Sequence, residues 1–259
     1  MGAFGRRLGI TAILAAAILA ASCNRKQELR QEAVTASAPV SFDTSDGIHL
    51  EGRLFGSADA TAGVVLAHML PADQTAWYTY AQRLASTGYR VLTFDFRGYC
   101  PGGDGGCSGG EKDPGLAAVD LNAALAFLRD DGVQRVGLIG ASMGGTAALV
   151  VASHEQGGIL AVVTLSAPEA IDSLGAGPEV MQTVSAAKLF IAGLEETTAA
   201  DAAKAFYDES LQPKRYEILT TGDHGTDILE GNQGERAKDL MSAWIARYVP
   251  PTAPTQAGG

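Results

Sequence analysis

The chain has 259 residues, of which 46% are hydrophobic and 19% charged, and its formal net charge at pH 7 is −10. This length and apolar content suit one globular domain with a large buried core. The acidic balance, and the lack of lysine and arginine clusters interleaved with aromatic residues, argue against nucleic acid as a partner.

The first 22 residues are predicted to be a targeting segment rather than part of the fold. Arg6 and Arg7 precede an uncharged apolar run over residues 8–21, which is shorter than the roughly 20 residues of a membrane-spanning helix. The run ends in small residues followed directly by Cys23, which resembles the lipobox of bacterial lipoproteins. The resemblance implies that Cys23 is lipidated and anchors the chain to a membrane of the bacterial cell envelope, facing the periplasm or the cell exterior. The alternative is an ordinary signal peptide cut near Ser22.

Polar segments without hydrophobic periodicity flank the domain. Residues 23–39 are charged and rich in Ala and Ser, which predicts a flexible tether, with a short surface helix as the alternative. Residues 250–259 contain three prolines and are predicted to form a disordered tail. The folded domain is therefore expected at residues 40–249.

Within the domain, apolar runs alternate with amphipathic segments. Strands are predicted at residues 40–44, 49–55, 63–68, 90–95, 136–139, 160–166, 188–193 and 214–219, and helices at residues 77–86, 116–130, 145–152, 199–210 and 235–248. Strands that alternate with helices, and are themselves continuous apolar runs, indicate buried parallel strands. The sequence therefore predicts an α/β fold: a mostly parallel, doubly wound sheet of about eight strands with helices on both faces.

One predicted strand runs through a tight turn into an apolar helix. The turn, Gly140-Ala141-Ser142-Met143-Gly144, has the G-x-S-x-G pattern of a nucleophile elbow, in which glycines let a strained turn expose the serine. The pattern also occurs at Gly106-Cys107-Ser108-Gly109-Gly110, but no apolar run precedes that copy, which indicates a loop. Ser142 is therefore the candidate nucleophile.

A serine nucleophile needs a base and a carboxylate that orients the base. The chain has four histidines. His224 lies in a Gly-Asp-His-Gly loop after the last predicted strand, and the carboxyl ends of parallel strands are where such sheets place their chemistry. His49 falls in the first hairpin, His68 ends a buried strand, and His154 follows the elbow helix. His224 is therefore the candidate base.

Five segments, taken in this order, resemble the α/β-hydrolases, near their dienelactone hydrolase-like and serine-esterase branches. They are Leu66-Ala67-His68-Met69-Leu70, Phe94-Asp95-Phe96-Arg97-Gly98, Gly140-Ala141-Ser142-Met143-Gly144-Gly145, Phe190-Ile191-Ala192-Gly193 and Gly222-Asp223-His224-Gly225. The resemblance covers about residues 40–249. It implies a serine hydrolase whose triad follows the order serine, acid, histidine.

The resemblance also suggests where the acid lies. In the family an aspartate commonly stands three residues after the glycine that ends the strand, and here that position is Glu196. Glutamate can do the same work with one more methylene. Glu195 and Asp201 are close enough to compete, and Glu169 occupies an alternative acid position that some hydrolases use.

Two backbone amides are expected to stabilise the oxyanion of the tetrahedral intermediate. One is the amide of Met143, which follows the nucleophile. The resemblance places the other at Leu70, in a loop where the family has His-Gly-x and this chain has His68-Met69-Leu70. Met69 thus replaces the family's glycine, and His68 is expected to order the loop rather than to act in catalysis.

A glycine-rich loop carries Cys100 and Cys107. Because an exported protein meets an oxidising compartment, these two cysteines are expected to form a local disulfide. No histidine or acid pair accompanies them at ligand spacing, which argues against a metal site, and no cofactor motif occurs in the chain.

Residues 167–187 leave room for no more than a short helix, so a minimal lid and an open site are expected. The sequence thus predicts a monomeric, membrane-anchored hydrolase that cleaves a small carboxylic ester through an acyl-enzyme. Peptide, thioester or lactone cleavage by the same triad is an alternative. A non-catalytic lipoprotein that uses the fold as a binding or assembly module is another.

Overall fold

The computed structural model describes residues 25, 27–34, 36–100, 107–155 and 158–251. An eight-stranded sheet forms its centre, in the order β1-β2-β4-β3-β5-β6-β9-β10. The predicted signal peptide, Cys23 and residues 252–259 of the predicted tail lie outside the described residues.

The sheet is mostly parallel. Its strands are β1 (Ser37–Asp43), β2 (His49–Phe55), β3 (Ala62–Ala67), β4 (Arg90–Phe94), β5 (Arg135–Ala141), β6 (Ile159–Leu165), β9 (Ala187–Gly193) and β10 (Lys214–Leu219). The β1–β2 and β2–β4 pairs are antiparallel, and every other pair in the sheet is parallel. The predicted α/β class and strand number are confirmed.

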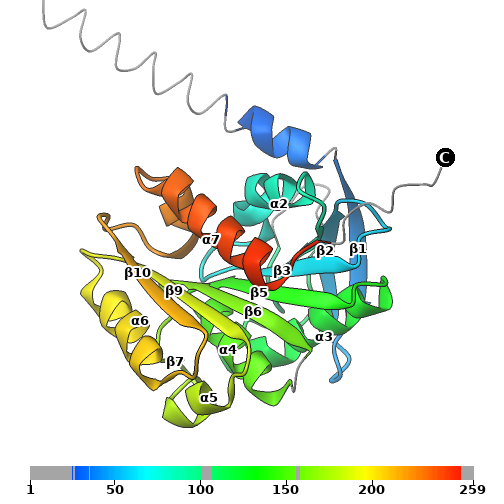
Figure 1. Cartoon of the computed structure of the whole chain (residues 1–259). Coiled ribbons are helices and arrows are strands. Elements are labelled where there is room, and N and C mark those ends of the chain that lie inside the picture. The colour runs from blue at the N-terminus through cyan, green and yellow to red at the C-terminus, as the bar shows by residue number, and fades with distance from the viewer. Residues whose placement is uncertain (1–24, 26, 35, 101–106, 156–157, 252–259) are drawn as a thin grey trace, which may run out of the picture.

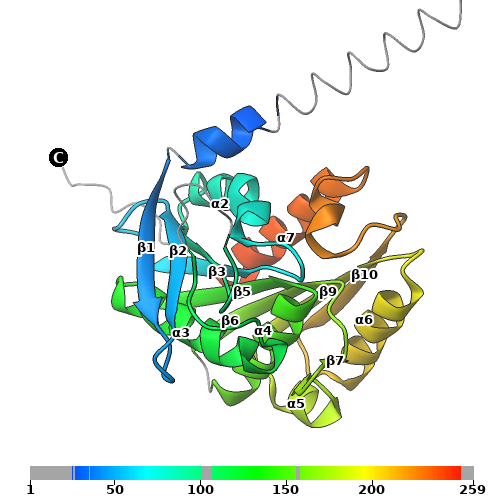
Figure 2. The same ribbon diagram turned by 180° about the vertical axis from the view of Figure 1, so that it is seen from behind.

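Helices cover both faces of this sheet (Figures 1 and 2). One face carries α2 (Tyr78–Ala85) and α7 (Gly234–Tyr248), and the other carries α3 (Ala117–Asp130), α4 (Met143–His154), α5 (Pro178–Thr183) and α6 (Thr197–Glu209). Each face has its own hydrophobic core. Along β3, Val65 packs into the α3–α4 core, whereas Val64 and Leu66 pack into the α2–α7 core. This alternation explains why the central strands are unbroken apolar runs.

The N-terminal side of the domain differs from the predicted flexible tether. Residues 27–34 form a helix, which was the alternative, and β1 begins at Ser37 rather than at residue 40. Ala33 is fully buried in the α2–α7 core. The Val34 carbonyl accepts hydrogen bonds from the Ser37 hydroxyl at 2.9 Å and from Arg53 at 3.2 Å. These tertiary contacts explain why a polar segment is held against the domain.

The connection between β6 and β9 is short, as predicted, but it contains a small hairpin in addition to the one short helix α5. Before α5, the strands β7 (Ala170–Ile171) and β8 (Leu174–Gly175) pair as a small antiparallel hairpin. Leu174 is 3% exposed and belongs to the α3–α4 core, and the partly buried Ile171 packs against the same core, so these two side chains hold the hairpin. In the part of the chain that the structure describes, no helix is long and apolar enough to cross a membrane.

Candidate active site

Ser142 occupies the turn between β5 and α4. Its backbone has φ 46° and ψ −117°, a strained conformation for a residue with a Cβ. The Ser142 amide donates to the Leu165 carbonyl at 2.8 Å, which fixes the turn to the end of β6. Only 8% of the residue is exposed. The turn thus has the geometry of a nucleophile elbow.

Two glycines of the motif allow this turn to close. A Cβ at Gly140 would lie 2.5 Å from the Gly145 amide nitrogen, inside the first turn of α4. A Cβ at Gly144 would lie 2.6 Å from the His68 carbonyl oxygen and closer still to the Ala67 carbonyl oxygen. The first turn of α4 therefore packs directly against the backbone of the loop that follows β3.

His224 and Glu196 come together from two neighbouring strands. Glu196 follows β9 and precedes α6, and His224 follows β10 and precedes the 3₁₀ helix η4 (Gly225–Leu229). The Nδ1–H of His224 donates to Oε1 of Glu196, because an ionised carboxylate can only accept. This tautomer leaves Nε2 of His224 with a lone pair, as a general base requires.

The other acids considered for this role do not contact His224 in the described residues. Glu195 is exposed, and its carboxylate lies beside Gly222. Glu169 is also exposed, and its backbone carbonyl accepts from the Ala176 amide. Of the candidate acids, the structure brings only Glu196 to His224.

The histidine loop packs against the elbow and against the loop after β3. A Cβ at Gly225, directly after His224, would lie 3.4 Å from the Ala141 Cβ, and the Met69 sulfur is closer still. Within the described chain, Ser142 and His224 share no hydrogen bond. Such bonds are often long or poorly aligned in free enzymes and tighten when substrate binds.

The loop after β3 is held from within by His68, which is fully buried. Its Nδ1–H donates to the Met69 carbonyl at 3.0 Å, and its Nε2 accepts from the Phe96 amide at 3.1 Å. Burial lowers the pKa of His68 to about 4, so the ring is neutral at pH 7. Both ring nitrogens are engaged, which gives His68 the loop-ordering position expected of it.

The amides assigned to the oxyanion site come from the two segments that meet at Gly144. Met143 begins α4, and its backbone N–H is one of the free donors of a helix N-terminus. Leu70 stands two residues after His68, is partly buried, and packs against the α3–α4 core. The close approach at Gly144 joins these two segments.

A disulfide joins Cys100 to Cys107. Among the described residues, no group of three or more His, Cys, Asp or Glu side chains could hold a metal ion.

Gln74 is a residue near this site that no sequence motif marks. It begins the 3₁₀ helix η1 (Gln74–Trp77), is fully buried, and hydrogen-bonds the carboxylate of Asp95 through its backbone N–H and its side chain. The one sequence signal was Asp95 itself, a carboxylate at the end of a buried strand, because a buried charge requires partners.

An elbow serine, followed in sequence by a carboxylate and a histidine at the carboxyl edge of a mostly parallel sheet, is the architecture of an α/β hydrolase. The model of the alpha/beta hydrolase fold family matches residues 64–240, and the chain belongs to this family. Among curated proteins the sequence has no match.

Solved structures with the same fold include three enzymes of low sequence identity. An esterase of Pyrococcus furiosus is 21% identical with a TM-score of 0.66, covering 82% of this chain and 93% of its own. A dienelactone hydrolase of Anabaena variabilis is 23% identical with a TM-score of 0.67, covering 82% and 98%. An esterase of Thermogutta terrifontis is 15% identical with a TM-score of 0.64, covering 81% and 98%. At these identities the similarity establishes the fold.

Proposed function

We propose that the protein is a serine hydrolase that cleaves carboxylic esters through an acyl-enzyme. The observation that carries the proposal is the hydrogen bond from His224 to Glu196, in a loop that packs beside the Ser142 elbow. A histidine held in this tautomer by a carboxylate is the arrangement that activates a serine hydroxyl.

The proposed reaction has two halves. The Ser142 oxygen attacks the acyl carbon while Nε2 of His224 takes the hydroxyl proton, and the amides of Met143 and Leu70 stabilise the oxyanion. The intermediate collapses, the ester C–O bond breaks, and His224 gives its proton to the leaving alcohol. A water molecule then attacks the acyl-enzyme with His224 again as base, which releases the carboxylic acid and restores the Ser142 hydroxyl.

The fold neighbours favour an ester, or its cyclic form, a lactone, over a peptide or a thioester, since two of those described above are esterases and the third is a dienelactone hydrolase. Peptide and thioester cleavage would use the same triad, and so would lactone cleavage. The competing proposal is a non-catalytic binding module.

The decisive test treats the purified domain with a fluorophosphonate probe and with short-chain nitrophenyl esters. We expect covalent labelling at Ser142 and ester turnover, both lost in Ser142→Ala. A matched control is Ser153→Ala, which removes a hydroxyl bonded to the Val150 carbonyl on the same helix and should keep both activities. A parent protein that neither labels nor turns over any acyl substrate would refute the enzyme proposal.

The acid is tested by a pair of neighbouring variants. Glu196→Gln removes the charge that His224 contacts and should lower kcat at least 100-fold, since an amide can hold the ring in the wrong tautomer. Glu195→Gln alters an exposed side chain one residue away and should leave kcat within about twofold. A larger loss of kcat in Glu195→Gln than in Glu196→Gln would show that Glu196 is not the acid of the triad.

We also propose, from the lipobox resemblance, that Cys23 is lipidated and holds the enzyme at the bacterial cell envelope. Expression in a bacterium with labelled palmitate should label the chain, and Cys23→Ser should abolish that labelling. Labelling that persists in Cys23→Ser would overturn this assignment.

A further inference from the structure

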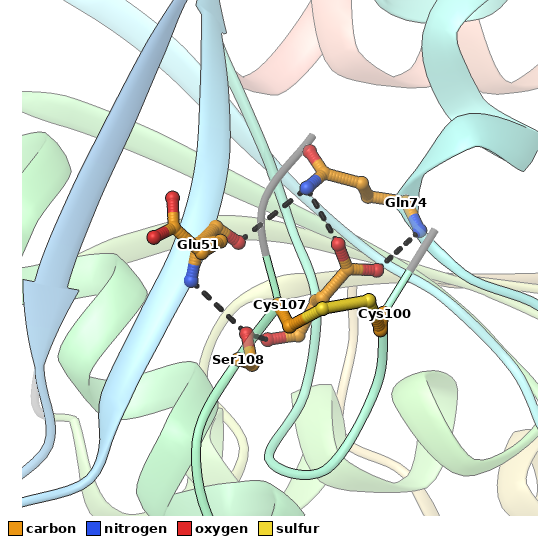
Figure 3. Close-up of a disulfide and its surroundings, with 6 residues drawn as sticks. Glu51, Gln74, Cys100, Cys107 and Ser108 are labelled. Atoms are coloured by element: carbon orange, nitrogen blue, oxygen red, sulfur yellow. Dashed lines mark hydrogen bonds between the residues drawn. A yellow bond between two sulfur atoms is a disulfide. The ribbon is translucent and has the colours of Figure 1, made fainter. Parts of the chain in front are cut away.

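Ser108, the serine of the second G-x-S-x-G segment, is buried and hydrogen-bonded. Its contacts lead to residues 68–74, which carry Leu70 and are called here the oxyanion loop. Ser108 is 6% exposed. Its hydroxyl donates to the Asp95 carbonyl at 2.7 Å and accepts from the Glu51 amide at 3.0 Å (Figure 3). One side chain thus joins the segment after Cys107 to β2 and to the residue that follows β4.

The Cys100–Cys107 disulfide lies next to Ser108 in the sequence. Cys100 follows Tyr99 and Cys107 precedes Ser108, and the Ser108 amide donates to the Tyr99 carbonyl at 3.0 Å. Figure 3 shows the disulfide beside Ser108, Glu51 and Gln74. The covalent bond therefore holds together the two chain segments that place the Ser108 hydroxyl.

Asp95, whose carbonyl accepts from the Ser108 hydroxyl, binds Gln74 at the C-terminal end of the oxyanion loop. Its carboxylate is fully buried and accepts from the Gln74 amide at 2.8 Å and from the Gln74 side chain at 2.6 Å. Gln74 is fixed in turn, because its side-chain oxygen accepts from the Thr93 hydroxyl at 2.9 Å. Thr93 and Asp95, at the end of β4, therefore hold Gln74 at the start of η1 by hydrogen bonds.

The next residue, Phe96, binds the N-terminal end of the same loop, since its amide donates to Nε2 of His68. Residues 95–96 thus contact both ends of residues 68–74, Asp95 through its carboxylate and Phe96 through its backbone amide, and Leu70 lies between these ends. A shift of residues 95–96 would move Leu70 relative to Met143, and an oxyanion donor works only when it is preset in place.

We infer that Ser108 is a positioning residue for the oxyanion loop, and that the Cys100–Cys107 disulfide keeps Ser108 in position. The inference rests on the proposed function, because the loop matters to catalysis through the Leu70 amide. Ser108 acts through Asp95 and does not touch the reacting atoms. The enzyme's turnover should therefore depend on the redox state of the cysteine pair.

The test compares Ser108→Ala with Ser210→Ala. Ser210 is a matched control, because it is also 6% exposed and its hydroxyl also donates to a carbonyl, that of Phe206 at 2.6 Å, outside the oxyanion loop. We expect Ser108→Ala to lower kcat about tenfold, less than the roughly 100-fold or greater loss of a whole oxyanion donor, with KM within twofold. Ser210→Ala should keep both constants within twofold.

The disulfide is tested on the same assay. A dithiol such as dithiothreitol reduces the Cys100–Cys107 bond to two thiols and is itself oxidised to a cyclic disulfide. Treatment should lower the kcat of the folded parent several-fold, whereas Cys100→Ser/Cys107→Ser should start at the lower value and not respond. A treated parent that keeps its full kcat would overturn the role given to the disulfide.

A readout independent of turnover separates this inference from the proposed function. Amide hydrogen exchange in residues 68–77 should be faster in Ser108→Ala and in the reduced parent than in Ser210→Ala, with far-UV circular dichroism unchanged. Unchanged exchange and unchanged kcat in Ser108→Ala would refute the inference even if the parent is an active esterase. Faster exchange in Ser108→Ala than in Ser210→Ala, together with a parent that never labels with fluorophosphonate, would uphold the loop coupling and refute only the proposed function.

Discussion

Adding a single methyl group at Gly144 tests how the elbow and the oxyanion loop are fitted together. In Gly144→Ala the new Cβ would lie 2.6 Å from the His68 carbonyl oxygen, against an ordinary contact distance of 3.4 Å or more. The two segments must therefore separate by at least about 0.8 Å, since the Ala67 carbonyl oxygen is closer still, and both are backbone, so no side-chain rotation can relieve the clash. Those segments carry the Met143 and Leu70 amides.

Misplacement by about 1 Å can cost roughly 100-fold in rate, so kcat of Gly144→Ala should fall by about that factor. The assay is steady-state hydrolysis of a nitrophenyl ester, with thermal unfolding to verify that the variant is folded at the assay temperature. The control is Gly177→Ala, where an added Cβ would meet no atom within 4 Å. A folded Gly144→Ala enzyme with the parent's kcat would show that the oxyanion site does not lie between these segments.

Three further changes probe the surroundings of the site. Because burial lowers the pKa of His68 from 6.5 to about 4, the unfolded chain binds a proton between these pH values that the folded chain does not. The stability advantage of the parent over His68→Gln, measured by urea unfolding, should therefore shrink by about 3 kcal/mol as pH falls from 7 to 4, and a constant difference would contradict the burial argument. Arg97→Ala strips the partner from the buried carboxylate of Asp120 and should cost about 3–5 kcal/mol in the same assay, whereas Arg129→Ala breaks a half-exposed pair and should cost less than about 1 kcal/mol. Met69→Gly restores the family's residue but removes a sulfur packed against the His224 loop, so kcat should fall, and an unchanged kcat would show that this packing does not position the histidine.

The buried strands at the centre of the sheet are predictable from the sequence because each one is a largely apolar run of neighbouring residues. A continuous apolar run such as β3 can only be buried on both faces, and that alone indicates a covered parallel strand. The position of Glu196 came from the resemblance to the α/β-hydrolases, in which an aspartate commonly stands three residues after the glycine that ends this strand. The structure places the Glu196 carboxylate on His224, although the family's residue is an aspartate.

Other features depend on contacts between distant residues, which leave no periodic signal. The helix at residues 27–34 is polar and short, and it is held by the burial of Ala33 and by one hydrogen bond from Arg53 to the Val34 carbonyl. Isolated helices of this length are marginal in water, so the sequence favoured a tether. The β7–β8 hairpin is equally invisible in the sequence, since two-residue strands carry no alternation and only Leu174 and Ile171 pack it against the α3–α4 core.

The serines of the two G-x-S-x-G segments differ in a structural property that separates the proposed nucleophile from the inferred positioning residue. Burial does not, since Ser142 is 8% exposed and Ser108 is 6% exposed. The hydroxyls differ in their partners. That of Ser108 gives its proton to the Asp95 carbonyl and accepts from the Glu51 amide, so both its donor and its acceptor roles are filled inside the fold. The Ser142 hydroxyl has no hydrogen-bond partner among the described residues, and its backbone holds it at the tip of a strained turn. A hydroxyl proton that no protein group accepts is free for a base to take, which supports Ser142 as the proposed nucleophile and Ser108 as the inferred positioning residue.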